Sequence, residues 1–538
     1  MKQLQLLDYI IFFVYFIIVS VYGYWIYNRK KSESASTKDF FLAEGSLTWW
    51  AIGASLIASN ISAEQFIGMS GNGFSMGLAI SSYEWMAAAT LVIVALFFMP
   101  IYLKNHIFTM PQFLSQRYNP TVSLIMAIFW LGLYILVNLT SILYLGALAV
   151  SGISGLDFNF CMWGLAIFSI VITIGGMKVI GFTDVIQVFF LIIGGLATSY
   201  IAINLVSENF GTAGLLNGLK MMKQHHDDHF HMIFKPGSTH YMELPGLTVL
   251  LGGMWIVNLN YWGCNQYITQ RALGADLKTA RNGLLFAAFL KLLMPVIVVL
   301  PGIAAYTLYN QGLFQQEMTE NGVIVADKAY PVLLNLLPDG LKGLSFAALT
   351  AAIVASLAGK ANSISTIFTL DIFRNYIGKD KSEAQLVAIG RIVIVVSMIM
   401  AILISPYMGI DKAGGFQFIQ QMTGLLSPGI FASFIMGFFW KRSNSAGALF
   451  AIVGGFIIAL GMHNNWLPFV DWTQVPFLDR MGWVFVICVV GMFVLSYVLP
   501  DEKKGLVIDA SMFKAHRSFV LGSAIVLVLL FGLYAFFW

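Results

Sequence analysis

Long apolar runs recur along the whole chain and are separated by short polar stretches. A run of about 20 apolar residues forms a helix long enough to cross the ~30 Å hydrocarbon core of a bilayer. The pattern predicts fourteen such helices. Their expected ranges are 6–28, 47–70, 78–103, 121–151, 158–177, 182–206, 246–270, 282–309, 340–373, 386–408, 414–439, 445–463, 480–499 and 517–538. The sequence therefore predicts an all-α integral membrane protein.

Composition agrees with this pattern. Of 538 residues, 58% are hydrophobic and only 10% are charged, and the mean hydropathy is +0.80. The two longest polar loops, 207–245 and 310–339, are too short for a soluble domain. We therefore expect residues 1–538 to form a single membrane domain whose surroundings are the lipid bilayer.

The basic residues predict the orientation, because cytoplasmic loops are enriched in Lys and Arg. One alternating set of loops holds 20 of them and the other set holds 7. The larger set is Arg29, Lys30, Lys31, Lys38, Lys104, Arg117, Lys178, Arg271, Lys278, Arg281, Arg374, Lys379, Lys381, Arg391, Lys441, Arg442, Lys503, Lys504, Lys514 and Arg517; the smaller is Lys2, Lys220, Lys223, Lys235, Lys328, Lys412 and Arg480. We expect a cell-membrane protein with both termini outside. The net charge of +4 then reflects topology, and no basic stripe with interleaved aromatics indicates nucleic acid.

Cysteine and histidine add little chemistry. Cys161, Cys264 and Cys488 are widely spaced and match no disulfide framework or CxxC metal pattern. The external run His225–His231 could bind zinc or nickel adventitiously, but its spacing fits no closed site. A solvated loop is the expectation there.

Polar side chains interrupt the apolar runs near Trp50–Trp85. Asn60, Ser62, Glu64, Gln65 and the pair Tyr83–Glu84 lie within or beside stretches that are otherwise suited to lipid. Each buried carboxylate or amide costs several kcal/mol unless a polar group meets it. Such residues indicate a protein that handles a polar solute inside the membrane, which favours a transporter.

Two predicted helices are broken at corresponding points. One break is the polar stretch 59–65, and the other is the stretch 258–266, which Gly252 and Gly253 precede. They lie five segments apart, as expected for the first helices of two inverted five-helix repeats whose unwound backbone binds substrate and cation. The alternative is that both are intact helices with polar faces packed against neighbours.

Several motifs resemble the sodium/glucose cotransporter family, especially its bacterial sodium/galactose symporters. These motifs are 60–68, 82–86, 182–187, 261–263 with 266–267, 286–291 and 416–420, and the likeness runs from about residue 40 onward. The resemblance implies a LeuT-type fold with a 5+5 inverted-repeat core. In that fold 6–28 is an extra N-terminal helix, 47–206 and 246–439 are the first and second repeats, and 445–538 forms three C-terminal helices.

The resemblance also implies a sugar site. The matching hydrogen-bonding residues are Asn60, Gln65, Glu84, Asn258, Lys291 and Gln420. Tyr261 matches an inner gate that stacks on the sugar, and Met69, Tyr83 and Phe416 match an outer gate. Ala87 stands where the sodium/galactose symporters have a serine. The alternatives are a solvated Glu84, a snorkelling Lys291 and amides that only hold helices together.

A sodium site is implied at Ala58, Ile61, Ala352 and Ser356. Ala355 replaces a serine ligand of the family, and Lys360 replaces an apolar residue one turn beyond Ser356. Because a buried charge needs a partner, we expect the charged atoms of Lys360 and Asp184 to lie within about 4 Å of each other or to be bridged by water. The alternatives are that Lys360 snorkels to the inner surface and sodium still binds, and that Asp184 serves only as an acid near a helix N-terminus.

Together these features predict sodium:hexose symport by alternating access, with a hexose, sodium and the bilayer as partners. The alternative is a sodium-independent or proton-coupled sugar carrier in which Lys360 replaces the cation. An enzyme is not expected, because Glu84 and Asp184 lie toward opposite faces of the membrane. A channel would need a continuous polar stripe, and no obligate protein partner is inferred.

Overall fold

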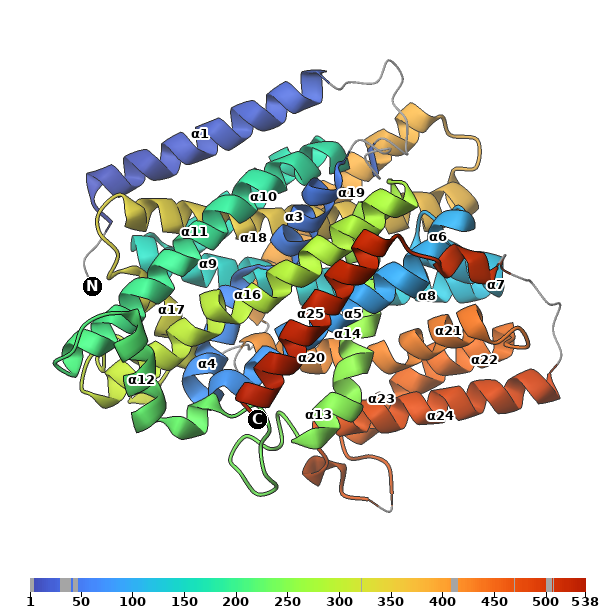
Figure 1. Ribbon diagram of the computed structural model, residues 1–538. Coiled ribbons are helices and arrows are strands. Elements are labelled where there is room, and N and C mark those ends of the chain that lie inside the picture. Colours follow the sequence, from blue (N-terminus) through green and yellow to red (C-terminus); the bar gives the residue numbers. More distant parts are fainter. Residues whose placement is uncertain are drawn as a thin grey trace.

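The computed structural model describes residues 4–29, 40–41, 47–320, 322–407, 415–468, 470–499, 506 and 508–538. The first half of the chain is helical (Figure 1). Its elements are α1 Leu6–Arg29, α3 Trp49–Asn60, η2 Glu64–Met69, α4 Ser70–Met76, η3 Gly77–Ser81, α5 Ser82–Ile93, η4 Val94–Phe98, α6 Met99–Lys104, α7 Met110–Arg117, α8 Pro120–Gly132, η5 Leu133–Leu139, α9 Thr140–Ser154, α10 Phe158–Ile174, α11 Met177–Asn209, α12 Leu215–His225, η6 Asp227–Phe230, α13 Leu247–Leu251, α14 Gly253–Gly263 and α15 Gln266–Leu273.

The second half adds one small hairpin, in which Thr319 pairs with Ile324. Its elements are α16 Leu277–Asn310, β1 Thr319–Glu320, β2 Val323–Ile324, η7 Ala326–Lys328, α17 Ala329–Leu334, α18 Leu341–Thr366, η8 Ile367–Ile377, α19 Glu383–Ile404, η9 Ser405–Tyr407, α20 Gly415–Gly424, α21 Ser427–Phe439, α22 Ser445–Leu449, η11 Phe450–Gly454, α23 Gly455–His463, η12 Trp472–Gln474, α24 Phe477–Val498, η13 Ala510–Phe513 and α25 Arg517–Phe536.

Ten helices of the described chain are long and apolar enough to cross a membrane, and α20 with α21 makes an eleventh if this pair, bent by 51°, is counted as one span. The protein is therefore a multi-pass membrane protein. Of the remaining expected spans, 158–177 corresponds to α10, whose 17 residues make it a shorter apolar helix. The other two, 47–70 and 246–270, are the predicted broken helices. Fourteen crossings remain a prediction.

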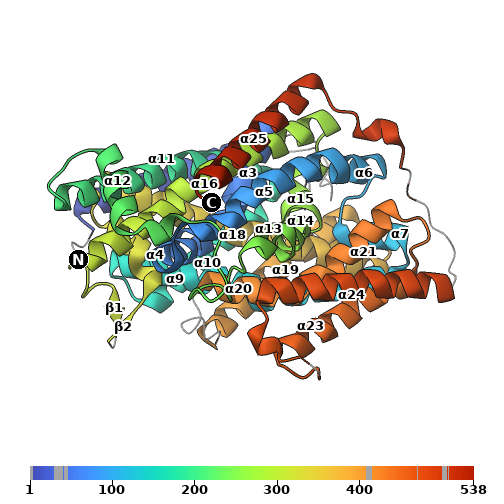
Figure 2. The ribbon, with the colours of Figure 1, turned by 60° about the horizontal axis from the view of Figure 1, so that its bottom comes forward.

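Both ends of the described chain lie at the end of the bundle that carries the two long loops (Figures 1 and 2). The buried Asp8 carboxylate accepts the backbone N–H groups of Gly340 and Gly343 at 2.7 and 2.9 Å, where it faces the positive N-terminus of α18. At the other end of the chain, the Phe537 carbonyl accepts the Met232 N–H at 2.8 Å. These contacts fix both termini on one side of the protein.

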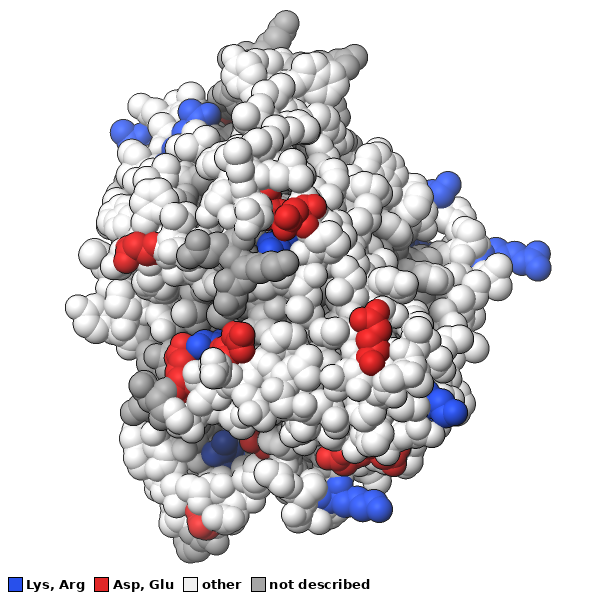
Figure 3. Space-filling model, turned by 90° about the vertical axis from the view of Figure 1, so that its left-hand side faces the viewer, with Lys and Arg blue, Asp and Glu red and all other residues white. Residues whose placement is uncertain are grey.

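Charged side chains are few on this face and mixed in sign (Figure 3). The His225–His231 run lies here, and it is less solvated than expected. His229 is buried, stacks on Tyr306 with ring centroids 4.0 Å apart, and contacts the Phe74 carbonyl through Nε2. Within the described residues, no group of three or more His, Cys, Asp or Glu could hold a metal ion. The basic residues Lys2, Lys30, Lys31, Lys38, Lys412, Lys503 and Lys504 lie outside the described residues.

The first predicted break is present and has a local cause. Helix α3 ends at Asn60, and Ile61 adopts an extended conformation. Ser62 and Gln65 then start a new helix. The Gln65 Oε1 accepts the Ser62 N–H at 3.0 Å, and the Ser62 hydroxyl accepts the Glu64 N–H at 3.1 Å. Such a Ser-x-x-Gln pattern caps a helix N-terminus, so the sequence itself separates α3 from η2.

The second broken helix is interrupted at two points. Neither point lies at the centre of the predicted stretch 258–266. α13 ends before Gly252, and α14 ends before Cys264 and Asn265. The Asn265 side chain caps α15 by accepting the Tyr267 N–H at 3.1 Å. Asn258 and Tyr261 therefore lie on the helical backbone of α14. The break at Cys264 and Asn265 follows Tyr261 by about one turn.

Candidate functional site

A cavity lies where α3, η2, α5, α14, α16 and α20 meet. It has a volume of about 60 Å³. All seven residues that the sequence analysis assigned to sugar binding line it: Asn60, Gln65, Glu84, Asn258, Tyr261, Lys291 and Gln420. These residues come from segments up to 360 positions apart, so the fold brings together the polar groups that interrupt separate apolar runs.

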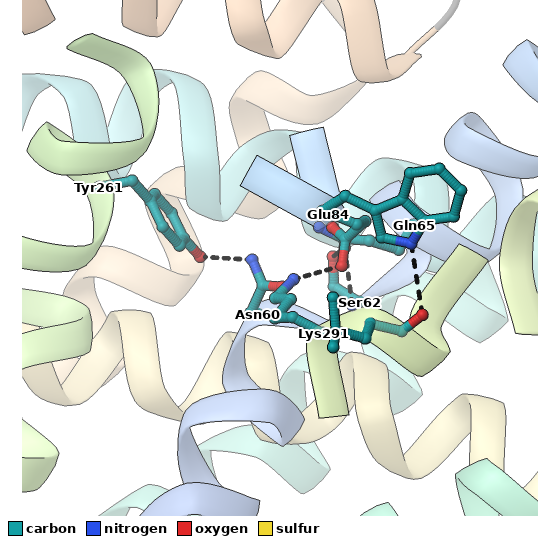
Figure 4. Close-up of polar contacts among 8 residues, drawn as sticks. Asn60, Ser62, Gln65, Glu84, Tyr261 and Lys291 are labelled. Atoms are coloured by element: carbon teal, nitrogen blue, oxygen red, sulfur yellow. Dashed lines mark hydrogen bonds and ion pairs between the residues drawn. The ribbon is translucent and has the colours of Figure 1, made fainter. Parts of the chain in front are cut away.

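A continuous polar chain crosses one wall of the cavity (Figure 4). The Lys291 ammonium lies 2.5 Å from the Glu84 carboxylate and also donates to the Asn60 side-chain oxygen. The Asn60 amide nitrogen in turn donates to the Tyr261 hydroxyl at 3.2 Å. Glu84 and Lys291 are nearly fully buried, with side-chain exposures of 4% and 1%. The snorkelling and solvated alternatives for these two residues are therefore wrong.

The α16 backbone at Lys291 is shaped by Pro295, which has no N–H to donate to the preceding turn. One carbonyl of that turn, that of Leu292, accepts the indole N–H of Trp85 at 3.3 Å. Trp85 follows Glu84 on α5, so this bond ties together the two helices that carry the ion pair. The wall is held by backbone as well as by side-chain contacts.

The remaining predicted residues differ in how free their polar groups are. Gln65 uses its oxygen to cap η2, which leaves its NH₂ group for the cavity. The Asn258 NH₂ group donates to the Met254 carbonyl of its own helix at 3.1 Å. Ala87 also lines the cavity, so the missing serine hydroxyl would have faced the same space.

Two of the three predicted outer-gate residues contact each other. The rings of Tyr83 and Phe416 pack edge to face with centroids 5.0 Å apart, and both line the cavity. Met69 is fully buried and is not part of the cavity lining. Its neighbour Gly68 lies against Phe416, where a Cβ atom would come within 2.8 Å of the Phe416 Cβ. A side chain at residue 68 would push Phe416 out of place.

The broken end of α3 presents carbonyl groups to α18. The Ser356 hydroxyl lies 3.4 Å from the Ala58 carbonyl oxygen and 3.0 Å from that of Ser59, and the Tyr267 hydroxyl also donates to Ser59. Ile61, which follows the end of α3, and Ala352 and Ala355 of α18 are also buried. Oxygen atoms from an unwound helix end and a hydroxyl are the ligand type that a hard monovalent cation prefers. The arrangement fits sodium, although Ala355 contributes no oxygen.

Lys360 makes no direct contact with Asp184, so the expected ion pair within about 4 Å is wrong. Its ammonium donates to the Asn138 side-chain oxygen at 3.1 Å and lies 4.0 Å from the ring centroid of Tyr267. The rings of Tyr134 and Tyr261 are 4.9 and 5.9 Å away. Glu64, which lines the cavity, is the acidic residue whose negative charge acts on Lys360. With an exposure of 4%, Lys360 is buried rather than snorkelling.

One carboxylate oxygen of Asp184 belongs to another network, and the other, Oδ1, has no partner. Its carboxylate accepts the Ser55 hydroxyl at 2.5 Å, and Ser55 accepts the Arg271 Nε–H at 3.0 Å. Arg271 is almost completely buried and stacks over Tyr267 at 5.0 Å. This network joins α11, α3 and α15. Spacing placed Lys360 on the Ser356 face of α18, but it could not show which neighbouring helix that face meets.

The sequence did not predict two members of these polar networks, Asn138 and Arg271. Asn138 is a single amide in the apolar run 121–151, and its isolation was the signal that it holds a buried partner. Arg271 was assigned to a cytoplasmic loop, because it lies at the polar end of the run 246–270. Its burial in the Asp184 network could not be read from its position in the chain.

Comparisons with known proteins agree with this geometry. The profile described as "SSF: Sodium:solute symporter family" matches residues 40–455. A Sodium/glucose cotransporter of Vibrio parahaemolyticus is 46% identical over 99% of both chains. The human Sodium/myo-inositol cotransporter 2 is 33% identical over 85% of this chain and 70% of its own.

A solved structure of a Na⁺-coupled sialic acid symporter, in a substrate-bound outward-open state, has a similar fold. The TM-score is 0.80 with 22% identity, over 93% of this chain and all of that one. The LeuT-type fold expected from the sequence is thereby confirmed, while the boundaries of its two repeats stay a prediction. With a family profile matched over most of its length and a relative matched end to end, the chain belongs to the sodium:solute symporter family.

Proposed function

We propose that this protein carries a hexose across the cell membrane together with sodium, by alternating access. The observation that carries the proposal is the cavity beside the break after α3, which is lined by carboxylate, ammonium, amide and phenol groups from six helices. A sugar ring needs donors and acceptors on several sides and an aromatic surface against its C–H face. This set of groups supplies both.

The Lys291–Glu84–Asn60 cluster is suited to a hydroxyl-rich ligand. Glu84 can accept from two hydroxyls and Lys291 can donate to others, so a sugar would exchange its hydrogen bonds with water for charge-assisted ones. Tyr261 and Trp262 place aromatic rings at the cavity with centroids 5.2 Å apart. Names of relatives point to the same ligand class, because glucose and myo-inositol are both six-membered rings bearing hydroxyl groups.

Sodium would bind at the carbonyls of Ala58 and Ile61, with Ala352 and Ser356 completing the site. Support comes from the Ser356 hydroxyl, which already faces the Ala58 carbonyl. The sodium-independent alternative loses its main argument, because Lys360 is held by Asn138 and tyrosine rings and does not neutralise Asp184. Sodium coupling is also the property named in the relatives.

Access would alternate between the Tyr83–Phe416 contact on one side of the sugar and Tyr261 on the other. We place the basic loops in the cytoplasm and both termini outside. Labelling tests that orientation: a membrane-impermeant maleimide should modify Ser238→Cys, and spare Asp380→Cys, in intact cells. Both positions are exposed, whereas the three native cysteines are buried. The opposite labelling pattern would invert the topology.

Uptake into proteoliposomes tests the proposed function. Radiolabelled galactose and glucose should enter when an inward sodium gradient is imposed, and should enter poorly when choline replaces sodium. Unlabelled hexose should compete, and amino acids should not. Saturable sodium-driven uptake of an amino acid, with no uptake of hexose, would contradict the assignment. If only myo-inositol competed, the protein would still be a sodium symporter, but its substrate would be myo-inositol and not a hexose.

A further inference from the structure

We propose that a cleft between α1, α10, α11 and α19 binds an anionic phospholipid, with an acyl chain along its apolar walls and the phosphate on Arg391. The cleft is separate from the central cavity and has a volume of about 350 Å³. α1 covers it from outside, and the ring of Phe16 packs on Phe168 of α10 with centroids 4.9 Å apart (Figure 1).

The walls are apolar and face the lipid. Val19 is buried at the floor, while Tyr24 and Val171 are 69% and 63% exposed at the rim. The polar side chains of the lining, apart from Arg391 and the Tyr24 hydroxyl, are those of Ser20 and Thr183. The Thr183 hydroxyl is already bonded to carbonyls of its own helix. Water would find few partners along such walls, whereas an acyl chain needs none.

Arg391 gives the cleft its one formal charge. Its Nε atom is buried and has no hydrogen-bond partner, and no ion pair among the described residues involves its guanidinium. The guanidinium carbon of Arg391 lies 5.7 Å from the centroid of the Phe40 ring. The Arg391 side chain is half-buried, and its buried Nε donor has no acceptor, which is costly. A phosphate is the acceptor that matches the planar donor geometry of a guanidinium.

The position of Arg391 along its helix suits a lipid headgroup. It lies eight residues after Glu383, at which α19 begins, so it is about 12 Å along the axis from that end. The cleft is formed by the last turns of α10 and the first turns of α11, beside the loops that carry most of the basic residues. Anionic headgroups gather on the membrane surface where Lys and Arg are enriched, so charge and depth agree.

Native mass spectrometry of the purified full-length protein tests the proposal with palmitoyl-oleoyl-phosphatidylglycerol and the matching phosphatidylcholine as probes. The wild type should retain phosphatidylglycerol in preference. Arg391→Gln should lower its affinity by about tenfold or more, as expected for lost charge-assisted hydrogen bonds. Arg391→Lys should keep part of it. Arg374→Gln removes a charge from another exposed site at the same end, and should leave binding unchanged.

A second pair of variants tests the acyl-chain wall without touching Arg391. Val171→Trp should fill the cleft and weaken retention of the lipid, whereas Ile167→Trp, one turn away and 56% exposed, lies outside the lining and should not. Equal retention of phosphatidylcholine by the wild type would overturn the proposal. So would inorganic phosphate displacing the lipid fully while Val171→Trp has no effect, because the site would then hold a free anion.

Discussion

The Lys291 ammonium lies 2.5 Å from the Glu84 carboxylate in the centre of the membrane domain, and neither side chain reaches solvent. Two charges can remain buried there only because each satisfies the other, with Asn60 as a further acceptor for Lys291. The pair is also the most strongly polar feature of the cavity wall. The same two residues therefore serve the folded state and, in our proposal, the ligand.

Removing Glu84 should separate these two roles. Glu84→Ala leaves a buried ammonium without its counter-ion, which should cost about 3–5 kcal/mol of stability and abolish hexose binding. Glu84→Gln keeps the shape and one acceptor, so it should fold better and lose at least about tenfold in affinity for galactose. Asp339→Asn removes an exposed acid and is the matched control. Unchanged galactose binding by folded Glu84→Gln would remove Glu84 from the site.

Substitutions of Tyr261 should distinguish the ring from the hydroxyl. Tyr261→Phe loses the hydrogen bond to Asn60, worth about 0.5–1.5 kcal/mol, and should reduce uptake by less than about tenfold. Tyr261→Ala also loses the ring that we propose as the inner gate, and should impair uptake much more at normal expression. Initial rates of galactose uptake measure both. Wild-type rates for Tyr261→Ala would rule out the gate.

Sodium affinity should follow the number of hydroxyl ligands on α18. Ser356→Ala removes the hydroxyl that faces the Ala58 carbonyl, and should raise the sodium concentration for half-maximal uptake. Ala355→Ser adds a hydroxyl and should lower it. The neighbouring Ala358→Ser has the same added atoms one turn further along and serves as the control. No change in sodium dependence in either test variant would place the cation elsewhere.

Lys360→Met tests whether a permanent charge replaces the cation. The wild type should depend steeply on sodium, and Lys360→Met should stay sodium-dependent, with a lower rate because Asn138 loses its partner. If Lys360 served as the cation, the wild type would instead show weak sodium dependence. The double variant Lys360→Met with Ala355→Ser would then gain it. Uptake measured at fixed galactose and varied sodium separates these outcomes.

Much of the site could be predicted from sequence because the chain's motifs resemble those of the sodium/glucose cotransporter family, so that family's sugar-binding positions could be carried over residue by residue. All seven proposed sugar-binding residues line one cavity, although they come from six helices. The first break was also predictable, since Ser62 and Gln65 form a local capping pattern. Spacing within a helix and local capping are properties that neighbouring residues determine.

What could not be predicted depends on which helices meet. Lys360 was assigned to Asp184 because both seemed to lie at a similar depth, yet Asn138 of η5 and the Tyr267 ring are its neighbours. Arg271 takes the place beside Asp184, through Ser55. Each error concerns a contact between distant segments, for which one sequence holds no direct signal.

The most direct test of the central claim is coupled flux in one set of proteoliposomes. An inward galactose gradient, imposed without a sodium gradient, should drive entry of ²²Na⁺, and Glu84→Gln should lose sodium and galactose entry together. That result is expected because both solutes would move through one conformational cycle around the same broken helix. Galactose entry that carries no ²²Na⁺ in the wild type would contradict symport.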